Sequence, residues 1–230
     1  MTGKRPEGGP GTPVDSRDLP LVRGVTPDAA SDSDSMGDSP TVVGVLLAAG
    51  TSSRFGDQNK LLATVDRDPV VRHAAQTLVD SGVDAVVVVL GYEADRVREA
   101  LDGLPVEIAV NDAYDTGQAS SLRTGIEAVR DRYPDADAVV VALGDMPFVA
   151  SETVDALRVA YETGAGDALA AAFEGTRGNP VLFDARHFDA LLDTEGDRGG
   201  REILLDGERS ALVDVADAGI RRDIDAPDDI

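Results

Sequence analysis

The sequence predicts an α/β fold, a three-layer αβα sandwich around a mostly parallel, mixed sheet. Short runs rich in Val, typical of strands buried on both faces, alternate with segments whose apolar residues recur at helical spacing. The chain has 230 residues, of which 42% are hydrophobic and 4% aromatic, so its core must consist mainly of Val, Leu, Ile and Ala. Strands and helices that alternate in this way form a parallel sheet with helices on both faces.

The alternation begins at Thr41 and continues to residue 162. Four apolar runs predict buried strands, over 42–48, 84–90, 106–110 and 137–143. Four segments of helical period follow them, over 69–80, 93–101, 120–132 and 151–162. The last third of the chain predicts further strands over 168–173, 181–183, 212–215 and 222–224, and helices over 188–192 and 198–205.

The first 40 residues have a different composition. They are rich in Gly, Pro, Ser and Asp, and they offer little apolar surface to offset the entropy of ordering the chain. We therefore expect a disordered, acidic N-terminal tail over 1–40 and one domain over 41–230.

The charge of the chain limits its partners. There are 43 acidic and 21 basic residues, a formal net charge of −22, and only two of the basic residues are lysines, Lys4 and Lys60. Such a surface repels phosphate backbones and anionic membranes, so we expect neither nucleic acid nor a membrane as a partner. A surplus of Asp and Glu over Lys is also typical of proteins that work in high salt, where repulsion among carboxylates is screened. We expect a halophilic protein; an acidic protein of a mesophile is the alternative.

The absence of certain sequence features predicts where the protein works. There is no Cys, which excludes disulfides and thiolate metal sites. No apolar run reaches the ~18 residues that a membrane-spanning helix needs. The first ten residues lack the apolar core of a signal peptide. We therefore expect a soluble, cytoplasmic protein.

The loop after the first strand has the composition of an anion-binding site. It reads Leu47-Ala48-Ala49-Gly50-Thr51-Ser52-Ser53-Arg54-Phe55-Gly56 and leads to Lys60. Small residues let backbone N–H groups approach an anion, while Arg54 can hold phosphate oxygens with its guanidinium and Lys60 supplies a point charge. The loop matches neither G-x-G-x-x-G nor G-x-x-x-x-G-K-[ST], and an ordinary flexible loop is the alternative. We predict that residues 47–54 and Lys60 bind an anion.

A single carboxylate follows the fourth predicted strand, in the sequence Gly144-Asp145-Met146-Pro147. Mg²⁺ prefers one or two carboxylates together with phosphate oxygens and waters. Asp145 is therefore a candidate catalytic residue and ligand of Mg²⁺, or of Mn²⁺ in its place, and Gly144 leaves room for the nucleotide. A turn or helix-capping Asp is the alternative.

The segment after the third strand places Gly117 and Ser120 at the start of a predicted helix. Free N–H groups and hydroxyls at such a position can meet polar atoms of a nucleotide. The alternative is that Ser120 only caps the helix.

These motifs, in order over residues 42–230, resemble those of the MobA-like nucleotidyltransferases, which share the Rossmann-like GT-A type fold of the nucleotide-diphospho-sugar transferases. In that family the first loop wraps the triphosphate and its Arg and Lys neutralise it, which implies that residues 47–54 and Lys60 bind a nucleotide and that Arg54 and Lys60 are catalytic. The family also has a Gly-Asp-x-Pro metal site. The spelling Ala48-Ala49-Gly50 resembles the molybdenum cofactor cytidylyltransferase branch, whereas the guanylyltransferase branch has Ala-Gly-Gly. Asn59 stands where a Pro is usual, and we expect it to loosen the loop without removing charge.

Three further assignments rest on this resemblance alone. Asp223-Ile224-Asp225-Ala226-Pro227 is similar to the family's terminal Asp-x-Asp-Thr-Pro, which implies Asp225 as the second metal ligand, with Asp223 or a chance acidic cluster as the alternatives. Gly178-Asn179-Pro180-Val181 is similar to Gly-His-Pro-Val, and the segment over 196–201 is similar to Gly-Asp-x-Gly-Ala-Arg. Both imply contact with the acceptor, through Asn179, Arg198 and Arg201; surface arginines that cap a helix are the alternative.

The resemblance implies a nucleotidyltransferase that moves a nucleoside monophosphate to a phosphorylated acceptor and releases pyrophosphate. On the Ala-Ala-Gly spelling this is CMP from CTP. The implied acceptor is molybdenum-bound molybdopterin, and the implied protein partner is a molybdenum hydroxylase or its maturation factor. The alternatives are transfer to a sugar phosphate or another cofactor precursor, and a non-catalytic chaperone of the molybdenum cofactor. A dinucleotide-binding oxidoreductase is a further alternative, against which the missing G-x-G-x-x-G argues.

Overall fold

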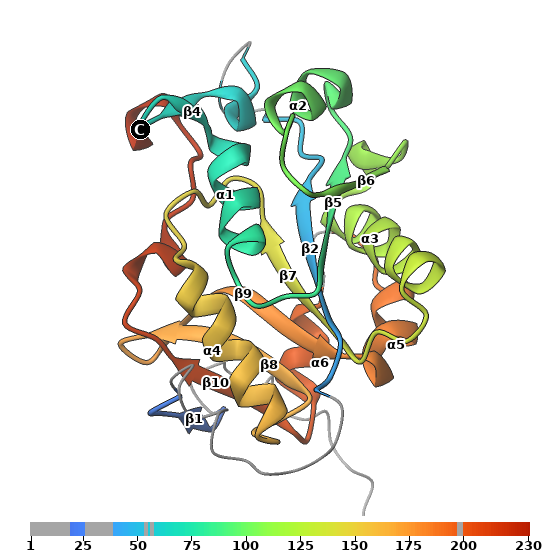
Figure 1. Ribbon diagram of the computed structural model, residues 1–230, viewed down its shortest axis with the longest axis vertical. Coiled ribbons are helices and arrows are strands. Elements are labelled where there is room, and N and C mark those ends of the chain that lie inside the picture. Colours follow the sequence, from blue (N-terminus) through green and yellow to red (C-terminus); the bar gives the residue numbers. More distant parts are fainter. Residues whose placement is uncertain (1–18, 26–38, 53–54, 56–57, 197–199) are drawn as a thin grey trace, which may run out of the picture.

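An eight-stranded mixed sheet crosses the centre of the molecule (Figure 1), in a computed structural model that describes residues 19–25, 39–52, 55, 58–196 and 200–230. The strand order is β1-β10-β8-β9-β7-β2-β5-β6. The strands are β1 (Leu21–Val22), β2 (Val42–Ala48), β5 (Ala85–Leu90), β6 (Glu107–Val110), β7 (Ala138–Leu143), β8 (Ala168–Phe173), β9 (Thr176–Asp184) and β10 (Ser210–Asp214). Every neighbouring pair is parallel except those of β9, which runs antiparallel to β7 and β8. A separate two-stranded ribbon joins β3 (Thr64–Val65) to β4 (Asp68–Pro69).

Helices cover both faces of this sheet. They are α1 (Val70–Val79), α2 (Ala94–Ala100), α3 (Gln118–Arg132), α4 (Ser151–Glu162), α5 (Phe188–Leu192) and α6 (Arg201–Asp206). Successive side chains of a strand point to opposite faces. Accordingly Leu46 belongs to one buried cluster with residues of α1, α2 and α4, while its neighbour Val45 belongs to another with residues of α3, α5 and α6. The predicted three-layer αβα sandwich with a mostly parallel sheet is confirmed.

Short 3-10 helices shape the loops between these elements. They are η3 (Lys60–Leu62), η4 (Tyr114–Thr116), η5 (Ala185–His187), η6 (Ala218–Arg221) and η7 (Pro227–Asp229). Two of them, η3 and η4, stand next to the carboxyl ends of β2 and β6, so they set the course of the chain where ligands bind in a parallel sheet. Among the described residues, no helix is both long and apolar enough to cross a membrane.

Three segments differ from the elements that the sequence predicts. Leu21–Val22, inside the stretch expected to be disordered, pair with Leu212 and Val213 and extend the sheet by one parallel strand. The strand expected over 181–183 begins earlier, at Thr176, because residues 176–177 pair with the end of β8. The strand expected over 222–224 is not a strand: in place of a ladder, Arg222 N donates to Gly219 O at 3.0 Å and Ile224 N donates to Asp145 O at 2.9 Å. Residues 198 and 199 of the last predicted helix lie outside the described part of the chain.

Candidate active site

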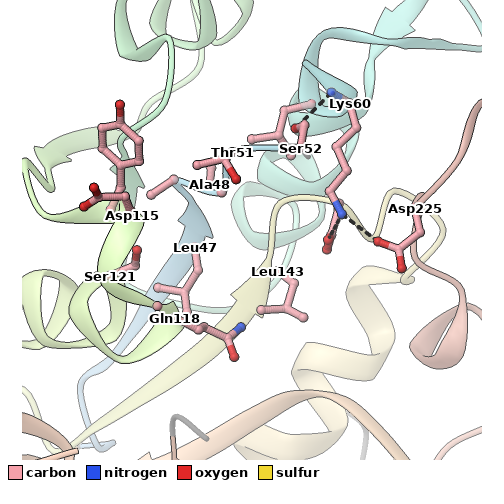
Figure 2. Close-up of a pocket in the computed structure, with 16 residues that line it drawn as sticks. Leu47, Ala48, Thr51, Ser52, Lys60, Asp115, Gln118, Ser121, Leu143 and Asp225 are labelled. Carbon is pink, nitrogen blue, oxygen red and sulfur yellow. Dashed lines mark hydrogen bonds and ion pairs between the residues drawn. The ribbon is translucent and has the colours of Figure 1, made fainter. Parts of the chain in front are cut away.

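A pocket of about 630 Å³ opens over the carboxyl ends of β2 and β7 (Figure 2). Loops from four parts of the chain line it: Leu47, Ala48, Ala49, Gly50, Thr51, Ser52, Lys60, Leu61, Tyr114, Asp115, Gly117, Gln118, Ser121, Leu143, Asp145 and Asp225. The pocket has two distinct ends in Figure 2, with Lys60 and Asp225 on one side and Asp115, Gln118 and Ser121 on the other. The structure thus brings together the predicted loop residues 47–52, Lys60, Asp145, Asp225 and Gly117. Arg54, Ser53 and Arg198 lie outside the described residues.

The described part of the first loop is fixed by hydrogen bonds among its own side chains. Ser52 has a left-handed backbone, with φ of 54°, which costs free energy for a residue with a Cβ and needs support from its surroundings. Its hydroxyl donates to Asn59 Oδ1 at 3.2 Å and accepts from Lys60 N at 3.1 Å. Asn59 is 3% exposed, and its Oδ1 also accepts from Leu61 N at 3.1 Å, which caps η3. Asn59 Oδ1 thus ties Ser52 to the start of η3, and the expectation that Asn59 loosens the loop relative to a proline stays a prediction.

Lys60 directs its ammonium group at two carboxylates that are distant in the sequence. Its Nζ lies 2.7 Å from Asp145 Oδ2 and 3.0 Å from Asp225 Oδ1. The Lys60 side chain is 14% exposed, and burial alone would lower its pKa. The charges and hydrogen bonds of Asp145 and Asp225 outweigh this burial and raise the pKa above its ordinary value, so Lys60 is firmly cationic.

Three carboxylates converge beside Lys60. Asp145, Asp223 and Asp225 each offer an oxygen, and these atoms lie within 4.8 Å of one another. Asp145 Oδ1 is buried and has no hydrogen-bond partner in the structure, a costly state for a carboxylate oxygen. An orphaned oxygen beside two more carboxylates is the oxygen-rich donor set that a hard divalent cation prefers, so these residues fit Mg²⁺ or Mn²⁺. Asp223 and Asp225 are both within reach of such an ion.

The C-terminal segment that carries two of these carboxylates is anchored on each side. Ile224 is fully buried in a cluster with Phe55 and Val70, and its N–H donates to Asp145 O. The guanidinium of Arg222 lies 3.8 Å from the centre of the Phe148 ring, a cation–π contact. These contacts explain why a stretch with few apolar residues reaches the pocket in a defined position.

The start of α3 shows how two neighbouring serines divide their roles. Ser120 Oγ lies 2.8 Å from Gly117 O and 3.0 Å from Ala113 O, so this hydroxyl holds the turn into α3, and it is Ser121 that lines the pocket. Asn111 Nδ2 donates to both hydroxyls, at 2.9 Å and 3.0 Å. Asn111 is 4% exposed and positions this wall of the pocket. The sequence pattern did not single out Asn111, although a polar residue directly after a buried strand is the available signal.

Two other predicted residues lie next to the pocket and do not line it. A Cβ at Gly144 would meet Ala48 Cβ at 3.0 Å and Leu47 O at 3.1 Å. The absence of a side chain at Gly144 therefore lets β2 pack closely. Asn179 faces a different, much smaller cavity of about 10 Å³, on the side of α1 and α4. Their contact with a nucleotide or an acceptor stays a prediction.

A half-buried arginine that the sequence analysis did not select stands near Arg201. Arg177 pairs with Ala172 near the carboxyl end of β8, and therefore lies at the same edge of the sheet as the pocket. Burial, and after it the positive charge of Arg201, lower the pKa of Arg177 below its ordinary value. Two neighbouring guanidinium groups are a favourable place for an anion.

The fold and this pocket define the class of protein. A mostly parallel αβα sandwich, with a lysine and a group of carboxylates where its strands end, is the arrangement of the GT-A type nucleotidyltransferases. The chain belongs to the MobA-like NTP transferase domain family, whose family model matches residues 44–212. The resemblance on which the sequence analysis relied is thereby confirmed, and the chain is a nucleotidyltransferase by family.

Relatives and solved structures agree with this family. A nicotine blue oxidoreductase of Paenarthrobacter nicotinovorans is 34% identical over 190 residues, which is 79% of this chain and 90% of the relative. A probable molybdenum cofactor guanylyltransferase of Natronomonas pharaonis is 34% identical over 114 residues, half of this chain and 54% of the relative. The crystal structure of Rv0371C of Mycobacterium tuberculosis in complex with manganese has a TM-score of 0.68 and 26% identity, and covers 82% of this chain and 95% of that one.

Proposed function

We propose that this protein transfers CMP from CTP to a phosphate of a molybdopterin-type acceptor, with release of pyrophosphate and with a requirement for Mg²⁺. The observation that supports the proposal most is the contact of Lys60 with Asp145 and Asp225, across 85 and 165 positions of the sequence. This contact combines a cation for the triphosphate with carboxylates for a metal at one end of a pocket large enough for a nucleotide.

In the proposed reaction an oxygen of the acceptor phosphate attacks the α-phosphorus of the triphosphate. The bond between the α-phosphorus and its bridging oxygen breaks, and pyrophosphate leaves with the electron pair. The attacking oxygen is already ionised, so the protein needs no general base. Its contribution is positioning and charge: the backbone N–H groups of 50–52 and the Thr51 hydroxyl would bind the phosphates, and Lys60 would offset their charge. Asp145, with Asp225 or Asp223, would hold a divalent cation that offsets charge on the phosphates.

The nucleoside belongs at the other end of the pocket. Asp115 offers a carboxylate, which accepts hydrogen bonds only, while the Gln118 amide and the Ser121 hydroxyl can donate or accept. Such groups suit the polar edge of a base. The choice of cytosine rests on the Ala48-Ala49-Gly50 spelling, and the pair Arg177 and Arg201 supports a phosphorylated acceptor at the same edge of the sheet.

An assay of pyrophosphate release tests the proposal directly. Purified protein in molar KCl is given Mg²⁺, molybdenum cofactor and one triphosphate at a time, namely CTP, GTP, UTP or ATP. We expect release with CTP and acceptor together and little with either alone. Preference for another triphosphate would overturn the cytidylyl assignment, and release only with a sugar phosphate would overturn the acceptor.

The role of Asp145 is tested in the same assay with Asp145→Asn, which keeps the shape of the side chain and removes its charge. We expect kcat/KM to fall by about 10²-fold or more, since a metal-held phosphate accounts for several kcal/mol of transition-state stabilisation. Asp189→Asn is the matched control, because the Asp189 side chain is 84% exposed and lies outside the pocket lining. An unchanged rate for Asp145→Asn, with thermal unfolding like that of the control, would rule out Asp145 as a metal ligand.

A second candidate function comes from the relative named nicotine blue oxidoreductase, which matches 79% of this chain. It predicts a redox change of nicotine blue, which is followed by the absorbance of the dye, without release of pyrophosphate. Measuring both signals on one preparation separates the two functions. A change of the dye with no pyrophosphate under any triphosphate would favour the oxidoreductase.

A further inference from the structure

The ammonium group of Lys60 stands where a positive charge is required. It lies 2.7 Å from Asp145 Oδ2 and 3.0 Å from Asp225 Oδ1, and both atoms belong to residues of the three-carboxylate group. Without a cation these oxygens, all within 4.8 Å of one another, would repel one another, and the partly buried Asp145 would be screened least by solvent. Lys60 therefore offsets part of the negative charge of the group in the structure described here.

Asp145 and Asp225 cannot serve Lys60 and a divalent cation equally well at the same time. A cation held by Asp145 and Asp225 would stand within a few ångströms of the ammonium, and two like charges that close repel. The triphosphate is the other anion that Lys60 is proposed to contact. The lysine thus has two anionic partners, and the presence of a metal decides between them.

The geometry of the loop suits a side chain that exchanges partners. The backbone N–H of Lys60 donates to Ser52 Oγ, and the preceding residue, Asn59, is buried, with its side-chain oxygen accepting from both Ser52 Oγ and Leu61 N. The flexible four-carbon stem beyond this fixed base ends at the lining of the pocket, between the small residues of the loop and the carboxylates (Figure 2). Rotation of the stem alone can carry the ammonium from one anion to the other.

We propose that Lys60 is an internal competitor of the metal: it occupies Asp145 and Asp225 while the pocket holds no nucleotide, and it moves to the triphosphate when metal and nucleotide bind together. The inference deepens the proposed function and rests on it for the identity of the nucleotide. The competition predicts that metal and nucleotide bind cooperatively. Metal alone binds weakly because it must displace the Lys60 ammonium from the carboxylates, and nucleotide alone binds weakly because Lys60 is held by them. Each ligand therefore strengthens the binding of the other.

Metal binding without nucleotide tests this competition. Mn²⁺ affinity is measured by electron paramagnetic resonance titration of the wild type, of Lys60→Met and of Arg130→Met, with no triphosphate present. Met keeps most of the length of the lysine stem and has no charge. Arg130 pairs with Asp189 and lies about 18 Å along α3 from Gln118, so Arg130→Met controls for the loss of one positive charge elsewhere.

We expect Lys60→Met to bind Mn²⁺ at least ~10-fold more tightly than the wild type, and Arg130→Met to stay close to the wild type. The same variant should bind CTP more weakly, and the gain in metal affinity on addition of CTP should shrink. A residue that only binds triphosphate would leave Mn²⁺ affinity unchanged when it is lost. Equal or weaker Mn²⁺ binding by Lys60→Met would therefore overturn the proposal.

Thermal unfolding gives a second measurement, which does not depend on a binding titration. In the presence of a chelator, Lys60→Met should unfold at a lower temperature than the wild type, since the carboxylates then repel, and Mn²⁺ should recover more of its stability than it adds to the wild type. A loss that Mn²⁺ does not recover would overturn the proposal. Neither measurement depends on turnover: absent pyrophosphate release would refute the proposed function while these results still decide the competition.

Discussion

At the scale of single residues, the carboxylate of Asp184 joins three elements at the end of the sheet opposite the pocket. Its Oδ2 accepts from the Tyr161 hydroxyl at 2.9 Å, and its Oδ1 accepts from the backbone and side chain of Arg186 at 2.9 Å and 3.0 Å. Burial would raise the pKa of Asp184, but the bonds from Arg186 and Tyr161 outweigh it and lower the pKa below its ordinary value. The same contact raises the pKa of Tyr161, whose burial acts in the same direction.

The lowered pKa of Asp184 predicts a stability that depends on pH. A carboxyl group whose pKa is lower in the folded state stabilises that state above its unfolded pKa, and this stabilisation is lost as the pH falls through the folded pKa. We expect Asp184→Asn to lower the free energy of unfolding by about 1–3 kcal/mol near neutral pH, and by progressively less as the pH falls below about 4. Urea denaturation across this range, with exposed Asp189→Asn as control, measures the difference. A cost that does not change with pH would show that shape and not charge is what Asp184 contributes.

The lining of the pocket shows which residues could be selected from the sequence. Lys60 could be selected because it is one of only two lysines and lies in a loop of small residues, and Asp145 because it comes shortly after a buried strand. Asn59 and Asn111 could not, because their importance comes from hydrogen bonds that only the folded loop creates. Ser120 and Ser121 are adjacent and chemically equal, and the direction in which each hydroxyl points decides which one faces the pocket.

At the scale of elements, helix α4 begins without a capping side chain of its own. Its N-cap residue is Ala150, and the capping acceptor comes from Asp217, far along the chain. Asp217 Oδ2 accepts from Ala150 N at 2.9 Å and from Thr153 Oγ1 at 2.8 Å, and its Oδ1 accepts from Gly219 N at 2.7 Å. One carboxylate thus caps α4 and fixes the start of the segment that leads to Asp225.

This double role predicts a cost that exceeds an ordinary cap. We expect Asp217→Ala to lower the free energy of unfolding by about 1–3 kcal/mol, because it removes a cap and leaves buried donors unpaired. Chemical denaturation measures this cost. Asp206→Ala, at the exposed end of α6, is the control and should change stability little. A result for Asp217→Ala within the range of this control would mean that water replaces the cap.

The elements that the sequence predicts correctly are those with a continuous apolar run. β2, β5 and β7 are buried on both faces, so their composition alone marks them. The first four residues of β9, Thr-Arg-Gly-Asn, have the composition of a loop. They are extended because this end of β9 pairs with β8. β1 is two residues long and depends on pairing with β10. Local composition carries no information on such pairing, so the sequence did not predict β1 or the start of β9.

At the scale of the whole molecule, the net charge of −22 acts on every element at once. Mutual repulsion of carboxylates destabilises the compact state, and salt reduces the distance over which it acts from about 10 Å at 0.1 M to about 3 Å at 1 M. We expect the midpoint of thermal unfolding to rise steadily as KCl goes from dilute to molar concentration. Calorimetry measures this shift, and an uncharged solute at matched water activity should not reproduce it. A midpoint that falls with KCl would contradict the expectation of a halophilic protein.

The contact between Lys60 and Asp225 joins residues 165 positions apart, and this separation bears on the order in which the molecule is completed. During synthesis Lys60 and Asp145 leave the ribosome well before Asp223 and Asp225 are added to the chain. The central strands can form first, but the carboxylate group gains its last two members only when the final segment docks through Ile224 and Arg222. Capture of a divalent ion would therefore distinguish a fully folded molecule from one whose last segment has not yet docked.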